Sequence, residues 1–272
     1  MGCQLSRNES IKLMNAGLRA ERSGLMSAAI ERLKEATTVD PTNDRAYYFQ
    51  GIIYRHRLQR PEAAVSAFRE AIAVKRDEAE YHYQLGDALT ELGRREDAVN
   101  SFGQALVYKK DHGIASLKRG RVLEELRRFD DAQAAYRLAI QAAPYKTEGF
   151  LLLANLYRSF GQLNHAAKVL ENASENHPQD GRLYREVGQI YSKLKQPQRA
   201  LRAYERSLQL EPGDRTLHLL IGQQLYALEE YRRAEIELKA FNRSASADVD
   251  LLQKRTADLL LKKIRTWKRR QR

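Results

Sequence analysis

Cysteine is nearly absent from this sequence, and so are several other signals of special chemistry. The 272 residues contain one Cys, one Trp and six Pro. The single Cys3 excludes an internal disulfide, so cysteine pairing says nothing about the cellular compartment. No apolar run approaches the roughly 18 residues that span a bilayer, and no apolar segment near the N-terminus resembles a secretory signal.

Catalytic motifs are also missing. The sequence has no Gly-rich phosphate loop and no nucleophile elbow. Its histidines show none of the spacings typical of metal ligands. They are His56, His82, His112, His165, His177 and His218. These absences predict that the protein is not an enzyme and holds neither a metal nor a cofactor.

The charge is unevenly distributed along the chain. The formal net charge is +12, and residues 254–272 contain nine Lys or Arg against one acid, Asp258. The remaining 253 residues hold 38 basic and 34 acidic groups, so they are almost balanced. A basic protein of this kind suggests nucleic-acid binding, but the excess belongs to a tail and not to the body of the chain.

What the sequence does contain is a repeat. Small residues recur every 34 or 35 positions, at Gly17, Gly51, Gly86, Gly120, Ala154, Gly188 and Gly222. Each is followed after twelve or thirteen residues by an alanine, at Ala29, Ala64, Ala98, Ala132, Ala166, Ala200 and Ala234. Four residues later stands a bulky apolar residue, at Leu33, Phe68, Phe102, Tyr136, Leu170, Tyr204 and Leu238.

The spacing within each repeat is helical. Six repeats add a small residue three positions after the bulky one, and positions i, i+4 and i+7 share one face of an α-helix. Each repeat therefore predicts two short amphipathic helices, in which the small residue lets a neighbouring helix approach. Gly24, Gly93 and Gly161 stand where the turn between the two helices is expected. The second repeat carries its extra residue in that turn.

This pattern resembles the tetratricopeptide repeat family. Segments such as "LGDALTELGRREDAVNSFGQAL" and "VGQIYSKLKQPQRALRAYERSLQLEPGD" look like ordinary members, although the family's opening tryptophan is absent throughout. The resemblance covers residues 10–243 as seven consecutive units. It implies an all-α, right-handed superhelical solenoid, with a flexible leader over residues 1–9 and a capping helix with a basic tail over residues 244–272.

The same resemblance implies a binding function. In such arrays the first helices of the units line a concave groove that holds an extended peptide or a partner's helix. The groove positions expected here are Arg45, Tyr48, Arg55, Tyr83, Arg121, Asn155, Arg158, Arg182, Arg185, Gln189 and Lys193. The tyrosines offer apolar bodies with polar tips, and Arg158, Arg182 and Arg185 are suited to hold carboxylates through two hydrogen bonds each.

The N-terminal sequence "MGCQLS" allows three interpretations. It resembles the end of a bacterial lipobox, in which a small residue precedes the cysteine that takes the lipid; the signal peptide would then be missing. Alternatively, Gly2 and Ser6 match the pattern for myristoylation, with Cys3 as a palmitoylation site. In the third interpretation Cys3 is an incidental residue of a flexible leader.

The C-terminal segment predicts a last helix. Val249, Leu252, Leu260, Ile264 and Trp267 fall near one face of it. A solvating cap is what repeat arrays require, but the tail carries more positive charge than a cap needs. Its cations are suited to anionic lipid, RNA or an acidic partner, and Trp267 to a membrane interface. These cations are Lys262, Lys263, Arg265, Lys268, Arg269, Arg270 and Arg272.

Together these features predict a non-catalytic interaction scaffold or assembly factor. The leading interpretation is a lipid-anchored, membrane-associated protein similar to the bacterial repeat lipoproteins that help to build envelope machinery such as pili or secretion channels. One alternative is a soluble cytoplasmic adaptor. The other is an RNA-associated protein that uses its basic tail.

Overall fold

The computed structural model describes residues 2–244 and 251–271. All fifteen regular elements in these ranges are α-helices. They form two compact units, Met1–Pro144 and Tyr145–Arg272. The all-α fold class expected from the repeat is confirmed within both units.

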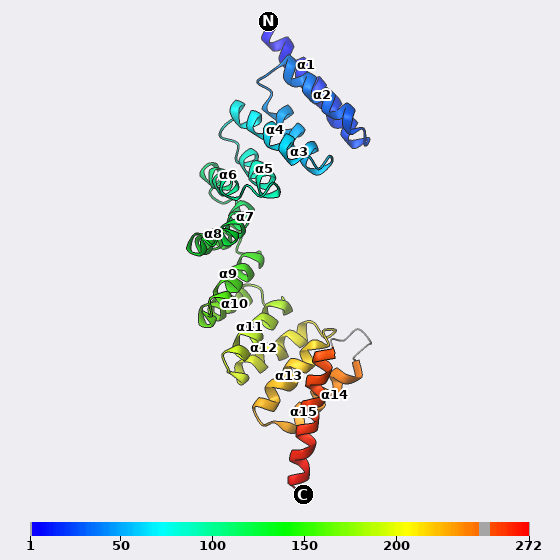
Figure 1. Cartoon of the computed structure of the whole chain (residues 1–272), viewed down its shortest axis with the longest axis vertical. Coiled ribbons are helices and arrows are strands. Elements are labelled where there is room, and N and C mark those ends of the chain that lie inside the picture. The colour runs from blue at the N-terminus through cyan, green and yellow to red at the C-terminus, as the bar shows by residue number, and fades with distance from the viewer. Residues whose placement is uncertain (1, 245–250, 272) are drawn as a thin grey trace. The chain divides into compact units, whose positions relative to one another are not determined.

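The first unit is a stack of four helix pairs (Figure 1). Its helices are α1 (Gly2–Arg22), α2 (Met26–Val39), α3 (Asp44–His56), α4 (Pro61–Val74), α5 (Ala79–Glu91), α6 (Arg95–Tyr108), α7 (Gly113–Glu125) and α8 (Phe129–Ala142). Each odd-numbered helix packs most extensively against the even-numbered helix that follows it. Each even-numbered helix from α2 to α6 also packs against the first helix of the next pair.

The second unit contains three further pairs and a last helix. Its helices are α9 (Glu148–Ser159), α10 (Leu163–Asn176), α11 (Gly181–Lys193), α12 (Pro197–Leu210), α13 (Thr216–Ala227), α14 (Tyr231–Ser244) and α15 (Leu251–Arg270). The last helix packs on α14 and α13. The two units therefore hold the seven helix pairs and the additional helix that the repeat predicts.

The repeating small residue sets how closely the two helices of a pair approach. A Cβ atom placed on Gly51 would lie 2.4 Å from the Phe68 ring, and one on Gly120 would lie 2.5 Å from the Tyr136 ring. Real Cβ atoms do not come this close to another carbon, so the ring occupies the space that a side chain would need. The predicted close approach is confirmed, and the bulky side chains Phe68 and Tyr136 are fully buried.

The turns inside the pairs share a left-handed backbone. The predicted turn glycines Gly24, Gly93 and Gly161 have φ values of 79°, 70° and 69°. Four other residues take this conformation without being glycine, which costs conformational energy. They are Gln59, Arg127, Lys195 and Glu229, with φ values of 51°, 58°, 56° and 63°. The extra residue of the second repeat lies in the turn that contains Gln59, as expected.

The N-terminal segment differs from the expectation of a flexible leader over residues 1–9. Helix α1 begins at Gly2, so the stretch is continuous with the first helix of the first pair. Ser10 holds this helix in place: its buried hydroxyl donates to the Ala36 carbonyl at 2.7 Å and accepts from the Asn43 amide at 2.8 Å. A helix anchored at this point extends toward its N-terminus at little cost, because adding residues to a formed helix is favourable.

Helix α15 covers the end of the second unit, although not through the expected face. Ile264 is buried as predicted, together with Ala257 and Leu261, whereas Leu252 is 69% exposed. Ala257, Leu261 and Ile264 follow the spacing of four and three residues that keeps side chains on one helical face. Val249 lies outside the described residues.

Candidate partner-binding surfaces

The first candidate surface is formed by the first helices of the pairs in the first unit, α3, α5 and α7. We call it the first-helix surface. Its centre is Asp87, whose side chain is 5% exposed. The Arg55 Nη2 atom lies 3.1 Å from one Asp87 carboxylate oxygen, and the Lys118 ammonium lies 2.6 and 2.5 Å from its two oxygens. One acid from α5 therefore joins a cation from α3 to a cation from α7.

Arg55 is held by two further groups of this surface. Its Nε atom donates to the Glu91 carboxylate and its Nη1 atom to the Gln84 amide oxygen, both at 2.8 Å. The Arg55 side chain is only 10% exposed, whereas Glu91 is 44% exposed. The guanidinium is therefore held in orientation by the buried Asp87 and the half-buried Gln84, and its outer side contacts the exposed Glu91.

Aromatic rings continue the first-helix surface beside these ion pairs. Tyr48 stacks on Tyr81 with 5.1 Å between ring centroids, and Tyr83 lies 5.0 Å from the His112 ring. Burial raises the pKa of Tyr48 to about 12, so its hydroxyl stays protonated at neutral pH. The Lys118 ammonium lies 5.3 Å from the centre of the Tyr83 ring, a cation–π distance.

The two remaining predicted residues of the first unit are exposed. The Arg45 guanidinium lies over the Phe49 ring at 5.9 Å, and Arg121 is exposed on α7. The predicted groove residues of the first unit therefore fall into two groups. The partly buried ones are Tyr48, Arg55 and Tyr83, and the exposed cations are Arg45 and Arg121.

Predicted arginines of the second unit are also paired with acids of the chain itself. Arg158 on α9 contacts the Glu186 carboxylate on α11 at 3.3 Å, and Arg185 on α11 contacts Asp214, just before α13, at 2.8 Å. Burial would raise the pKa of Asp214. Hydrogen bonds from Thr216 and Arg185 outweigh that effect and hold the pKa below its ordinary value.

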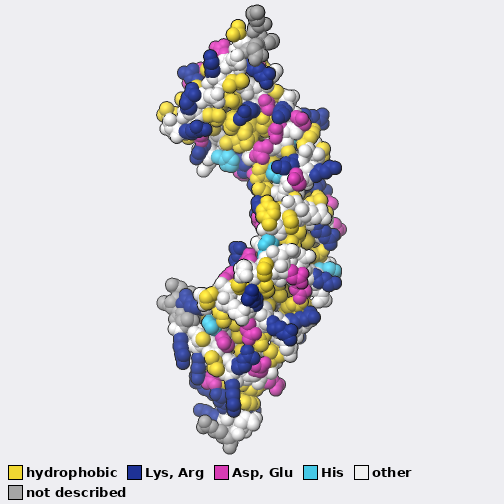
Figure 2. Space-filling view, turned by 180° about the vertical axis from the view of Figure 1, so that it is seen from behind, with side chains coloured by type: hydrophobic (Ala, Val, Ile, Leu, Met, Phe, Trp, Pro, Cys, Tyr) yellow, Lys and Arg dark blue, Asp and Glu magenta, His cyan; other side chains and the backbone are white. Residues whose placement is uncertain are grey.

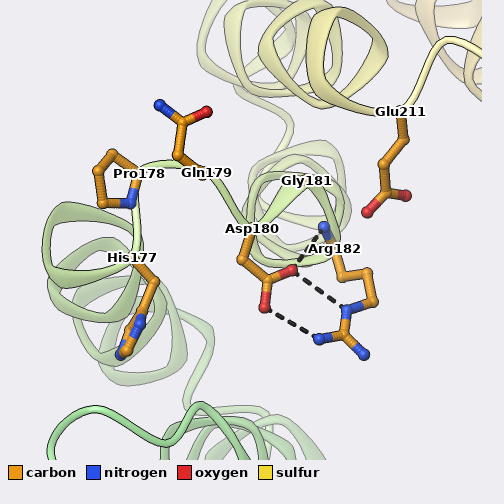
Figure 3. Close-up of a pocket in the computed structure, with 7 residues that line it drawn as sticks. All are labelled: His177, Pro178, Gln179, Asp180, Gly181, Arg182 and Glu211. Carbon is orange, nitrogen blue, oxygen red and sulfur yellow. Dashed lines mark hydrogen bonds and ion pairs between the residues drawn. The ribbon is translucent and has the colours of Figure 1, made fainter.

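The Arg182 side chain pairs with a different acid from that of Arg185. It contacts Asp180 at the start of its own helix at 3.1 Å, and its side chain is 64% exposed. Figure 3 shows these two side chains together in a cavity of about 450 Å³, with the Glu211 carboxylate on the far side of Arg182. A partner's carboxylate would have to compete with Asp180 and Asp214 for the two arginines.

The other predicted residues of this unit are polar and less constrained. Asn155 and Lys193 are exposed, and Gln189 is half-buried. None of these three has a side-chain hydrogen bond or ion pair to another described residue. Their side-chain hydrogen-bonding groups are therefore not engaged by internal contacts within the described ranges.

The acids that neutralise the arginines were not recognised in the sequence as their partners. Glu91, Glu186 and Asp214 lie 36, 28 and 29 residues after the arginines that they hold. These separations are close to one repeat, which places each acid on or beside the neighbouring first helix. A search for acids about one repeat away from each arginine would have found them.

The predicted cations of the tail lie on α15. Lys268 pairs with Glu235 on α14, and hydrogen bonds from Lys239 and Lys268 hold the pKa of Glu235 below its ordinary value. Lys262, Lys263, Arg265, Arg269 and Arg270 are exposed and form no ion pair within residues 2–244 and 251–271. Lys and Arg side chains gather at the C-terminal end of the second unit in Figure 2. Arg272 lies outside the described residues.

The lone cysteine, the possible metal ligands and the apolar helices are the remaining candidates. Cys3 lies in α1, and its side chain is outside the described residues. Among the residues that are described, no three His, Cys, Asp or Glu side chains are placed to hold a metal ion. None of the described helices combines the length and the apolar character needed to cross a membrane.

Solved structures with the same architecture support the fold. A tetratricopeptide repeat protein from Parabacteroides merdae has 20% identity and a TM-score of 0.57, and the match covers 94% of this chain and 99% of that one. PilW, a widely conserved type IV pilus biogenesis factor, has 23% identity and a TM-score of 0.54, over 75% and 94% of the two chains. YrrB, a repeat protein with an unusual peptide-binding site, has 18% identity and a TM-score of 0.54, over 72% and 97%. No curated protein sequence matches the chain.

Sequence models of one repeat family match both units. A tetratricopeptide repeat model matches residues 14–80, 57–106 and 83–147, and a second model of the same description matches residues 181–214. Together the matches cover more than half of the chain. With the seven helix pairs and the close contacts of their small and bulky residues, they identify the chain as a member of the tetratricopeptide repeat family.

Proposed function

We propose that the protein is a non-catalytic interaction scaffold that binds a partner segment on the first-helix surface. The observation that carries this proposal is the arrangement around Arg55. Its guanidinium is held by the buried Asp87 and by Gln84, while the exposed Glu91 occupies its outer side. Half-buried tyrosines lie on the same helices.

This arrangement favours exchange of one carboxylate for another. A partner's acidic side chain that replaced Glu91 would meet a guanidinium already in its bound orientation, so little side-chain entropy is lost on binding. Tyr48 and Tyr83 would supply apolar contact area at low entropic cost beside the charged contact. The expected partner is therefore an extended or helical segment that combines an acidic residue with apolar ones.

The proposal is tested by photo-crosslinking in cells of the source organism. A photoreactive phenylalanine analogue is placed at Tyr83, on the first-helix surface, or at Arg69, an exposed position of the second helix α4. We expect a defined crosslinked protein from position 83 and much less of it from position 69. Mass spectrometry of the adduct identifies the partner and its segment.

The crosslinking result has two outcomes that contradict the proposal. One is no adduct at position 83 while the variant protein is folded and present at normal levels. The other is the same adducts in the same amounts from both positions, because a surface that binds no better than an arbitrary exposed site is not a binding surface.

We further propose that the scaffold is held at a membrane by a lipid on Cys3. The support is the sequence "MGC" alone, and the lipid route is either a bacterial lipoprotein or acylation of Gly2 and Cys3. Because each buried CH₂ adds about 0.8 kcal/mol to membrane binding, Cys3→Ser should release the protein from the membrane fraction. Intact-mass measurement of the native protein distinguishes a lipid on Cys3 from one on Gly2. A soluble, unmodified native protein would favour the cytoplasmic adaptor.

A further inference from the structure

A pocket at the end of the second unit is separate from the first-helix surface. It has a volume of about 430 Å³ and lies where α15 meets the turn between α13 and α14. This volume is within the range of about 300–1,000 Å³ that is usual for ligand sites. The pocket is built wholly from residues of the second unit.

Aromatic side chains form the apolar part of this pocket. The Tyr231 ring lies 4.7 Å from the Trp267 ring and 5.3 Å from the Tyr226 ring, in tilted and edge-to-face arrangements. Leu259, 53% exposed, adds an aliphatic side chain. Trp267 therefore packs against the second unit and is 36% exposed, instead of standing free for insertion into a lipid bilayer.

Cations surround the aromatic part. Lys262, Lys263 and Arg270 line the pocket from α15, and no acidic residue lines it. None of the three forms an ion pair with any described residue. The nearby acids Glu230 and Glu235 pair with Arg233 and Lys268, whereas Glu229 lies exposed in the turn just before Tyr231.

From this geometry we propose that the pocket binds an acidic peptide segment with one aromatic or large aliphatic side chain. The apolar side chain enters beside Tyr226, Tyr231 and Trp267, and flanking carboxylates contact Lys262, Lys263 and Arg270. Apolar burial supplies the anchor, and opposite charge selects for acidic neighbours.

Two other ligand classes fit less well. Single-stranded nucleic acid is held by bases that stack on open ring faces, whereas these three rings pack on one another. A membrane surface would need a broad apolar face, and the outer face of α15 near Trp267 consists of charged side chains. An acidic peptide uses both the concave aromatic part and the unpaired cations.

The experiment uses the full chain and its only tryptophan, Trp267, as the reporter. A capped pentapeptide of four glutamates around a central phenylalanine is titrated while Trp267 emission is recorded. We expect a saturable change in emission. Pentapeptides with a central glycine, or with lysines in place of the glutamates, should bind at least about tenfold more weakly, because each lacks one of the two contributions.

Matched variants locate the contact on α15. Lys262→Gln with Lys263→Gln removes two pocket cations, and Arg265→Gln with Arg269→Gln removes two cations that do not line the pocket. Both variants lose the same net charge from the same helix. The first should weaken peptide binding about tenfold and the second less than about threefold, since distant exposed charges are screened. Circular dichroism checks that both variants stay helical.

Three results would overturn the proposal. An equal loss of peptide affinity in both double variants would mean that binding depends only on the net charge of α15. A Trp267 response to phosphatidylglycerol vesicles or to oligothymidine, with none to the peptide, would assign the pocket to a membrane or to nucleic acid. No saturable response to any of these probes would leave the pocket as packing of the capping helix.

Discussion

The first-helix surface and the C-terminal pocket contain the same kinds of residue but differ in charge balance. Each places cations beside tyrosines. On the first-helix surface Arg55 and Lys118 share the buried Asp87, and Glu91 completes the neutralisation. In the pocket Lys262, Lys263 and Arg270 have no acidic partner among the described residues.

This difference separates two ways of recognising an acidic partner. A neutralised surface would bind by exchange, so it would reject acidic ligands whose geometry is no better than that of its own carboxylates. An unneutralised pocket attracts any acidic ligand from a distance, and its apolar part must supply the selection. We expect the paired charges of the first arrangement to matter for folding stability, and the unpaired cations of the second to matter little.

Removing single charged residues from the two regions should have its largest effect on the free energy of unfolding of the first-helix surface variants. Asp87→Ala leaves the nearly buried Arg55 without its main partner and should lower the free energy of unfolding by about 2–3 kcal/mol. Glu91→Ala, in the same network but exposed, should cost less than about 1 kcal/mol. Lys262→Ala in the pocket should change stability by less than about 0.5 kcal/mol.

Urea unfolding followed by circular dichroism measures all three variants. If Glu91→Ala and Asp87→Ala were equally destabilising, burial would not be what distinguishes the acids of the first-helix surface. A large loss of stability in Lys262→Ala would mean that the pocket cations form stabilising contacts within the chain.

The second prediction uses salt to sharpen the comparison. Raising NaCl from 0.05 to 0.5 M should weaken binding of the acidic pentapeptide to the pocket roughly tenfold, because exposed charges are screened over a shorter distance. The stability that Asp87 contributes should change far less, since buried pairs are screened less than exposed ones. Trp267 titrations and urea unfolding at both salt concentrations provide the data. Peptide affinity that does not depend on salt would argue against recognition by the unpaired cations.

The smallest effect concerns pH and the Arg185–Asp214 pair of the second unit. The pKa of Asp214 lies below its unfolded value of 3.8, so the folded protein binds fewer protons there than the unfolded chain. The pair therefore stabilises the fold above about pH 4 and loses that contribution as the pH falls through the lower folded value. Its size should be less than about 1 kcal/mol, because the pair is partly exposed.

Asp214→Asn and Arg185→Gln should each flatten the pH dependence of stability between pH 5 and pH 2. Lys262→Gln, which removes an unpaired pocket cation, serves as the comparison and should leave that dependence nearly unchanged. Unfolding by urea at several pH values is the measurement. A pH dependence in Asp214→Asn identical to that of the original chain would exclude this pair as a contributor.

Much of the fold could be predicted from particular residues. Gly51, followed by Ala64 and Phe68, predicts a close helix pair, because a Cβ atom at position 51 would lie only 2.4 Å from the Phe68 ring. Gly93 predicts a left-handed turn, although Lys195 adopts the same turn without glycine. The leader was not predicted correctly, since its polar residues gave no sign that Ser10 would hold α1 in place.

Less of the candidate sites could be predicted. The repeat register placed Tyr48, Arg55 and Arg185 on first helices, but it could not tell a free guanidinium from a paired one. Pairing depends on which acid of the neighbouring repeat lies within about 3 Å, and small rotations of each helix decide that. The pocket was missed because Trp267 meets Tyr226 and Tyr231 only where α15 packs on the last helix pair, and the repeat pattern does not specify that packing.

By itself the sequence determined the helical period, the seven pairs of a small and a bulky residue, and the concentration of positive charge in the tail. These follow from local rules of helix spacing and side-chain size, which repeat with every unit. Only the tertiary structure decided which cations are neutralised and where Trp267 lies. Charge pairing and pocket formation depend on distances between side chains of different helices, and a linear pattern specifies the face on which a residue stands but not its partner across the interface.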